Sequence, residues 1–183
     1  MKTKKRLLTA AALAVLALGA TAAIATAAVW KDGATNVSSS ISIQFEGSEF
    51  WEPTEGDSMQ CAEKFTLKTS GGSTAEITSF TITKTGCATT GALSGCELST
   101  AEAKGLPWTV HANTEDLTIT NLRIKRTFKA GCAISELDKT VNSTVTLFSP
   151  SAIETIETRG ETGEYVQFGS FEATTNSGTY GIG

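Results

Sequence analysis

The chain has 183 residues, with 15 Lys or Arg, 19 Asp or Glu and a single His, for a formal net charge of −4. A net acidic chain attracts neither the phosphates of nucleic acid nor anionic lipid headgroups, so we expect no nucleic-acid partner. Any Ser-His-Asp or Cys-His arrangement would have to use the one histidine, His111.

The N-terminus has the pattern of a secretory signal peptide. Four basic residues precede an uncharged, Ala-rich run that ends in the small residues Ala25-Thr26-Ala27-Ala28. The alternative is a retained membrane anchor, because the run is long enough to span a bilayer. We expect cleavage, with residues 1–28 as signal peptide and 29–183 as a single secreted β domain free of the membrane. Without the four basic residues, eleven remain against nineteen acids, a net charge of −8.

Short runs of alternating apolar and polar residues then follow along the chain. Ile41, Ile43 and Phe45 share one face, and the same period recurs as far as Val166 and Phe168. A period of two predicts half-buried strands, and Gly- and Ser-rich turns separate them. Only Thr100 to Lys104 resembles a short helix. About nine strands without a long helix predict an all-β fold, either an antiparallel β-sandwich or a barrel-like domain.

The segment from Glu46 to Glu63 is acidic and holds two adjacent aromatic residues. We take Phe50, Trp51, Glu52, Glu55 and Asp57 as the candidate ligand surface. The aromatics could stack on a sugar, the acids with Ser58 could bind calcium, or the segment could be a solvated loop. The acids do not follow the D-x-D-x-D-G calcium pattern, so we predict no metal site, and calcium is the one cofactor considered. A glycan or a protein is the partner that such a surface would fit.

The chain has four cysteines, Cys61, Cys87, Cys96 and Cys132. An even number in an exported chain predicts two disulfides, and their spacing contains neither a C-x-x-C redox pair nor a zinc pattern. Sequential pairing and nested pairing are equivalent in loop entropy. A weak internal repeat slightly favours the sequential arrangement, since EITSFTITKTGC and TITNLRIKRTFKAGC each run a Thr-rich strand into Gly-Cys.

Two residues on the later strands, His111 and Trp108, have simple structural interpretations. His111 lies between Val110 and Ala112 and should face solvent, whereas Trp108 should pack in the core.

The basic stretch RIKRTFK, from Arg123 to Lys129, should be the solvent face of a strand or should meet the acidic segment 46–57, in the same molecule or in the next. The alternation slips at Thr120-Asn121, which predicts a β-bulge.

The Gly-Cys punctuation, the strands between and the segment SGCELSTAEAKGLPW resemble a group of small exported β-rich proteins of actinobacterial type. The resemblance covers Cys61 to Cys132 and implies a bacterial, secreted β protein without implying an activity. The chain also has no G-x-S-x-G, H-E-x-x-H or phosphate-loop motif. We therefore expect a non-catalytic exported protein that acts outside the cell in binding or structure. The alternatives are a carboxylate-dependent glycan hydrolase and a ligand-carrying β-barrel.

Overall fold

The computed structural model describes residues 28–114, 116–147, 152–162 and 165–183, so nearly all of the expected signal peptide lies outside the described residues. Within these ranges no helix is long and apolar enough to cross a membrane. The described elements are β1 (Trp30–Asp32), β2 (Thr35–Asn36), β3 (Ile41–Thr54), β4 (Asp57–Thr69), β5 (Thr74–Ile82), β6 (Ala88–Thr89), the 3-10 turn η1 (Gly91–Leu93), β7 (Leu98–Ala103), β8 (Trp108–Ala112), β9 (Asp116–Phe128), β10 (Glu136–Leu147), β11 (Thr155–Thr162), β12 (Tyr165–Ala173) and β13 (Tyr180–Ile182).

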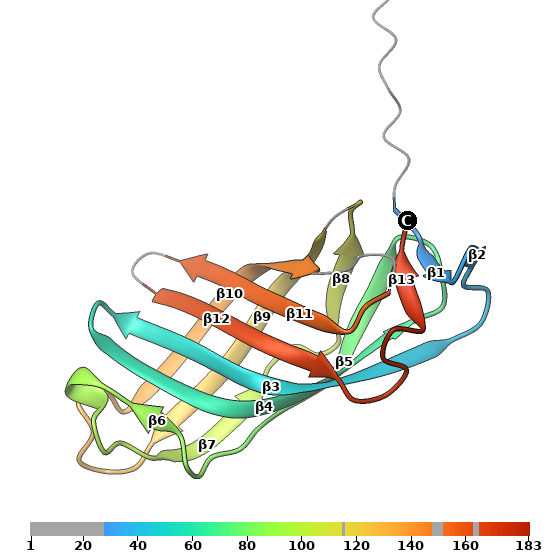
Figure 1. The fold of residues 1–183 in the computed structure, drawn as a ribbon. Coiled ribbons are helices and arrows are strands. Elements are labelled where there is room, and N and C mark those ends of the chain that lie inside the picture. Colours follow the sequence, from blue (N-terminus) through green and yellow to red (C-terminus); the bar gives the residue numbers. More distant parts are fainter. Residues whose placement is uncertain (1–27, 115, 148–151, 163–164) are drawn as a thin grey trace, which may run out of the picture.

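Eight of these strands close into an antiparallel barrel (Figure 1). The order around the wall is β3, β4, β5, β8, β9, β10, β11 and β12, and β12 pairs back onto β3. The all-β prediction is therefore confirmed, and of the two architectures considered the chain forms the barrel. Closure removes the free edges that an open sheet of this size would expose.

Five short strands lie outside the barrel wall. Strands β13, β1 and β2 form a separate sheet at one end, whereas β6 adds to β4 and β7 adds to β9 toward the other end (Figure 1). The segment Thr100 to Lys104, which resembles a helix in sequence, belongs mainly to β7, and that expectation is wrong. Pairing with β9, which places Ala101 opposite Arg126, overrides the weak local preference.

On most strands the interior is packed by the alternating apolar side chains that the sequence pattern predicts. Strand β12 is an exception, because Val166 and Phe168 face outward and Tyr165, Gln167 and Phe171 are buried. Phe65 stacks on Phe45 with ring centroids 4.9 Å apart and meets the edge of Phe171 at 5.0 Å. Trp108 is buried, as expected, and its indole Nε1 donates a hydrogen bond of 2.8 Å to the carbonyl oxygen of Lys104. Aromatic pairs of this kind add stability beyond the area that they bury.

The predicted β-bulge on β9 is confirmed. The ladder between β9 and β10 shifts register opposite Asn142, and Asn121 adopts a left-handed backbone with φ of 58°. The amide N–H of Asn121 donates to Oδ1 of Asn142 at 3.1 Å. This extra residue allows Ile119 and Leu122, on the two sides of the slip, both to be buried in the core.

Candidate functional sites inside and outside the barrel

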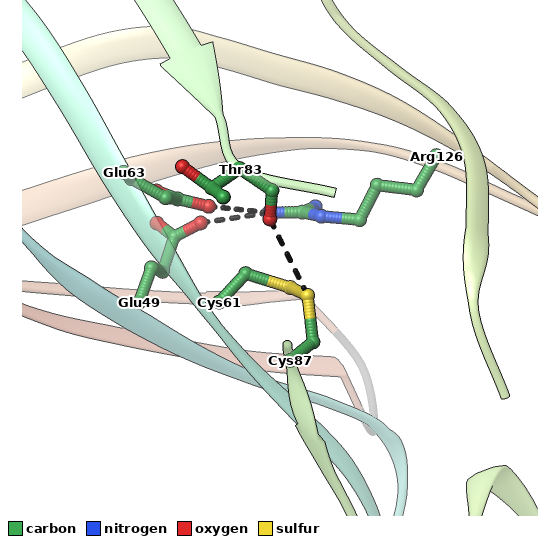
Figure 2. The surroundings of a disulfide bond; sticks show 6 residues. All are labelled: Glu49, Cys61, Glu63, Thr83, Cys87 and Arg126. Carbon is green, nitrogen blue, oxygen red and sulfur yellow. Dashed lines mark hydrogen bonds and ion pairs between the residues drawn. A yellow bond between two sulfur atoms is a disulfide. The ribbon is translucent and has the colours of Figure 1, made fainter. Parts of the chain in front are cut away.

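An ion cluster lies inside the barrel, where the fold would lead one to expect apolar side chains. Arg126 points inward from β9, and its Nη2 lies 2.7 Å from Oε2 of Glu49 on β3 and 3.7 Å from Oε1 of Glu63 on β4 (Figure 2). The three residues are each 1% exposed. The guanidinium also stands 4.6 Å from the ring centroid of Trp51, a cation–π contact. We call Glu49, Glu63 and Arg126 the inner ion cluster.

Strand β12 adds two polar side chains to this cluster. Nη1 of Arg126 donates to the hydroxyl oxygen of Tyr165 at 3.3 Å, and that hydroxyl donates to Oε1 of Gln167 at 2.8 Å. The Gln167 amide in turn donates to Glu49. Three strands, β3, β9 and β12, are thus joined through buried hydrogen bonds, which are stronger in this apolar interior than in water. Strand β4 joins them through the longer contact of Glu63 with Arg126.

Burial sets the electrostatics of the cluster. It raises the pKa of Glu49, although the charge of Arg126 opposes the shift. Burial raises the pKa of Glu63 further, and the neighbouring Glu49 charge adds to the effect while Arg126 again opposes it. The pKa of Tyr165 is also raised by burial. Each shift favours the neutral form of the acid, because a charge is costly away from water.

Two disulfides are present, as predicted, and no cysteine in the described residues is free. Cys61 is bonded to Cys87 and Cys96 to Cys132, which is the sequential arrangement. The first disulfide lies beside the inner ion cluster (Figure 2), because Cys61 and Glu63 are two positions apart on the inward face of β4. The Cys87 sulfur is 3.5 Å from the carbonyl oxygen of Thr83.

The five residues of the candidate ligand surface do not come together on one face. The acidic segment is a hairpin of β3 and β4 rather than a loop, and Trp51 points into the barrel with 0% exposure. Oε1 of Glu52 accepts a hydrogen bond from the Gly56 amide at 2.5 Å, and Oδ1 of Asp57 accepts one from the Ala92 amide at 2.7 Å. Glu55 is exposed at the turn.

The carboxylates of Glu52 and Asp57 therefore hold backbone amides. In the described ranges no group of three or more His, Cys, Asp or Glu is arranged to hold a metal ion.

Phe50 lies on the outer face of the wall, next to strand β12 and away from Trp51. It lies directly opposite Phe168 of β12, and Val166 follows on the same outward face opposite Glu52. Phe168 is 41% exposed, the one large hydrophobic residue in the described part of the chain that counts as exposed. The sequence pattern places Val166 and Phe168 on a shared face, and the structure shows that this face is the outer one. We call Phe50, Val166 and Phe168 the outer aromatic patch.

The basic stretch on β9 is divided between the two faces of the wall. Arg123 binds both carboxylate oxygens of Asp138 at 2.7 and 2.6 Å, and Lys125 lies 2.8 Å from Glu136, so both take the predicted solvent side. Arg126 takes the opposite side and meets Glu49 of the acidic segment in the same molecule. His111 faces solvent from β8, as expected.

The inner ion cluster was not predicted from the sequence, although the positions of its residues in the strand alternation indicate it. Arg126 is in phase with the buried Ile124 and Phe128, and Glu63 is in phase with Cys61 and Phe65. When one strand has an acidic residue at an inward position and another strand has a basic residue at an inward position, the two indicate a buried ion pair.

Comparison with known proteins places the chain in a family. The model of a family described as alkane oxidation protein activator PraA/PraB-like matches residues 1–158. The chain belongs to the PraA/PraB-like family. The match includes the whole inner ion cluster, whereas the outer aromatic patch of this PraA/PraB-like chain has Val166 and Phe168 beyond the matched range. No curated protein matches the chain, and no solved structure does.

Proposed function

We propose that this chain is an exported, non-catalytic β-barrel protein that assists the oxidation of alkanes by contacting apolar material through the outer aromatic patch. The family description supplies the connection to alkane oxidation. The two disulfides fit an oxidising compartment outside the cytoplasm, which agrees with the signal-peptide pattern of residues 1–28.

The observation that carries the proposal is the pairing of Phe50 with Phe168 on the outside of the wall. The core already holds most of the large apolar side chains of the described residues, so two phenylalanines opposite each other on the outer face, Phe168 exposed and Phe50 half-buried, need another explanation. Transfer of apolar surface from water to a hydrocarbon is favourable by about 25 cal/mol per Å². A small patch of this kind gives weak, reversible adsorption, which suits an accessory protein better than a permanent complex.

The other side chains that could take part in a reaction support a non-catalytic role. The four thiols form disulfides, and the carboxylates of Glu52 and Asp57 hold backbone amides at the hairpin turn. A glycan hydrolase needs two acids facing one cleft, and a ligand carrier needs interior space. Large side chains such as Trp51 and Trp108 occupy the interior, so the ligand carrier gains no support. The hydrolase gains none from Glu52 and Asp57, whose carboxylates are used by backbone amides.

The test is adsorption of the purified protein to dodecane droplets, together with dodecane consumption by alkane-oxidising bacterial cells to which the protein is added. We expect wild type to adsorb and to increase consumption, and a Phe50→Ser, Phe168→Ser double variant to lose most of both effects. The matched control is Ser48→Ala with Ser170→Ala, which changes the neighbouring cross-strand pair on the same two strands.

Three results would contradict the proposal. They are equal adsorption by the double variant and the control, failure of wild type to adsorb, and oxidation of dodecane by the purified protein without cells. Circular dichroism of each variant distinguishes a lost contact from a lost fold.

A further inference from the structure

The inner ion cluster contains one more acidic group than basic group. Glu49 from β3 and Glu63 from β4 face a single guanidinium, that of Arg126 from β9, and Tyr165 from β12 is the remaining titratable neighbour. At the same level of the wall, β5 contributes Ile82 opposite Glu63 and β10 contributes Leu137 opposite Arg126. If both carboxyls were ionised, one negative charge would remain without compensation in a site excluded from water.

The hydrogen bonds of Arg126 show which carboxyl it compensates. Its Nη2 donates to Glu49 at 2.7 Å and its Nη1 to Tyr165 at 3.3 Å, whereas Glu63 lies 3.7 Å away, beyond hydrogen-bonding distance. Neither oxygen of the Glu63 carboxyl accepts a hydrogen bond from a protein donor, although the side chain is 0% exposed. Arg126 is therefore the partner of Glu49, and Glu63 is the acid without a cation.

Glu49 and Glu63 both lie close to one nitrogen of Arg126, since an oxygen of each carboxyl is within 3.7 Å of Nη2. Glu49 accepts hydrogen bonds from Arg126 and Gln167, and these bonds stabilise its ionised form. Both oxygens of Glu63 are buried without a hydrogen-bond partner, so an ionised Glu63 would be a buried charge that no donor stabilises. The proton therefore belongs on Glu63.

We propose that the barrel interior binds one proton at neutral pH, carried by Glu63, and that release of this proton in alkaline solution loosens β4 from β3. The ionisation is Glu63-COOH to Glu63-COO⁻, with the proton passing to solvent. Two ionised carboxylates beside a single guanidinium then repel each other inside the wall. This inference does not depend on the proposed function.

The direction of the pH dependence follows from the raised pKa of Glu63. The folded chain holds this proton more tightly than the unfolded chain, whose Glu has the ordinary pKa of 4.5. The contribution to stability is therefore fully present below that value, and it is lost as the pH rises toward the raised pKa of the folded state. Between the two pKa values, each pH unit lowers the ratio of folded to unfolded protein by up to about tenfold.

The first experiment compares urea unfolding of three proteins from mildly acidic to alkaline pH. Wild type should lose stability as the pH rises. Glu63→Gln, which keeps the size and shape of a neutral, protonated Glu63, should lose this slope and should be the more stable protein in alkali. Glu46→Gln is the matched control, because Glu46 lies on the outer face of the same hairpin and pairs with the exposed Lys64, and it should follow wild type. Parallel profiles for wild type and Glu63→Gln would overturn the proposal.

The second experiment is infrared spectroscopy of the folded wild type. At neutral pH it should show the C=O stretch of one protonated carboxyl group, which disappears on alkaline titration and is missing from Glu63→Gln. A neutral-pH spectrum without a protonated carboxyl would overturn the proposal. This measurement uses wild type and decides the question even if Glu63→Gln does not fold.

Discussion

Arg126 and Glu49 form a buried ion pair, 2.7 Å between Nη2 and Oε2, that joins β9 to β3 across the interior of the barrel. The two strands are not neighbours in the wall, so this pair is a direct polar connection between distant parts of it. A buried ion pair adds little net stability relative to an apolar pair of the same size, but loss of one partner leaves an uncompensated charge.

Replacement of Arg126 by Met should destabilise the protein by about 3–5 kcal/mol at neutral pH, because the cation that Glu49 faces is removed. Urea unfolding measures the effect. The loss should shrink in acid, where both glutamates are protonated and need no cation. Arg123→Met is the control on the same strand, and it should cost about 1 kcal/mol or less because the Arg123–Asp138 pair is exposed to water. Similar losses for the two variants would show that the inner pair is no more important than a surface pair.

Peptide mapping without reductant should recover one cross-linked fragment that contains Cys61 and Cys87 and another that contains Cys96 and Cys132. Recovery of a Cys87–Cys96 fragment would refute this pairing. The two disulfides enclose similar lengths of chain, with sequence separations of 26 and 36 residues. On loop entropy alone, removal of either should cost about 3–4 kcal/mol. Any larger cost for Cys61→Ala with Cys87→Ala would come from the cluster beside it.

Gly47→Ala should be strongly destabilising, although Gly47 has an ordinary strand backbone. A Cβ at this position would collide with the carbonyl oxygen of Ser170 and would lie 2.7 Å from Cα of Phe171. Because these are backbone atoms of β12, the neighbour can yield only by moving the strand. We expect a loss of about 1–3 kcal/mol in thermal unfolding. Ser48→Ala, at the next residue with an outward side chain, should change stability by less than about 0.5 kcal/mol.

Asn121 should tolerate Gly but not Val. Its left-handed backbone, with φ of 58°, suits Asn and Gly and crowds a β-branched side chain. We expect Asn121→Val to cost about 1–2 kcal/mol and Asn121→Gly to remain close to wild type, as measured by denaturant midpoint. Equal effects would mean that the bulge is held by Asn142 alone and that the residue type at 121 is unimportant.

Sequence patterns predicted the strands well because alternation reports burial directly. The bulge on β9 could also be predicted, because the apolar alternation in the sequence slips between Ile119 and Leu122. Closure of the sheet into a barrel could not be predicted from the sequence. A sandwich and a barrel use the same alternating strands and differ only in which distant edge strands pair. The ladder from β12 to β3 decides this, and it joins residues far apart in the chain.

The candidate site was predicted less well, for a physical reason. Acidic residues close in sequence were treated as one surface, but successive strand residues point to opposite faces. Phe50 and Trp51 are neighbours in the chain and lie on opposite sides of the wall, one outside and one buried. Arg126 was grouped with Arg123 for the same reason, although the two point in opposite directions.

The ladder between β3 and β12 also determines when the molecule can finish folding. β12 begins at Tyr165, near the end of the chain, whereas β3 begins at Ile41. A chain that emerges N-terminus first therefore has β3 with one unpaired edge until almost all of the polypeptide has been delivered. During that interval the edge of β3 can recruit a strand from another copy, and a chain cut before Tyr165 would keep that hazard permanently. Aggregation of C-terminally truncated protein, rather than a smaller soluble barrel, is the expected consequence.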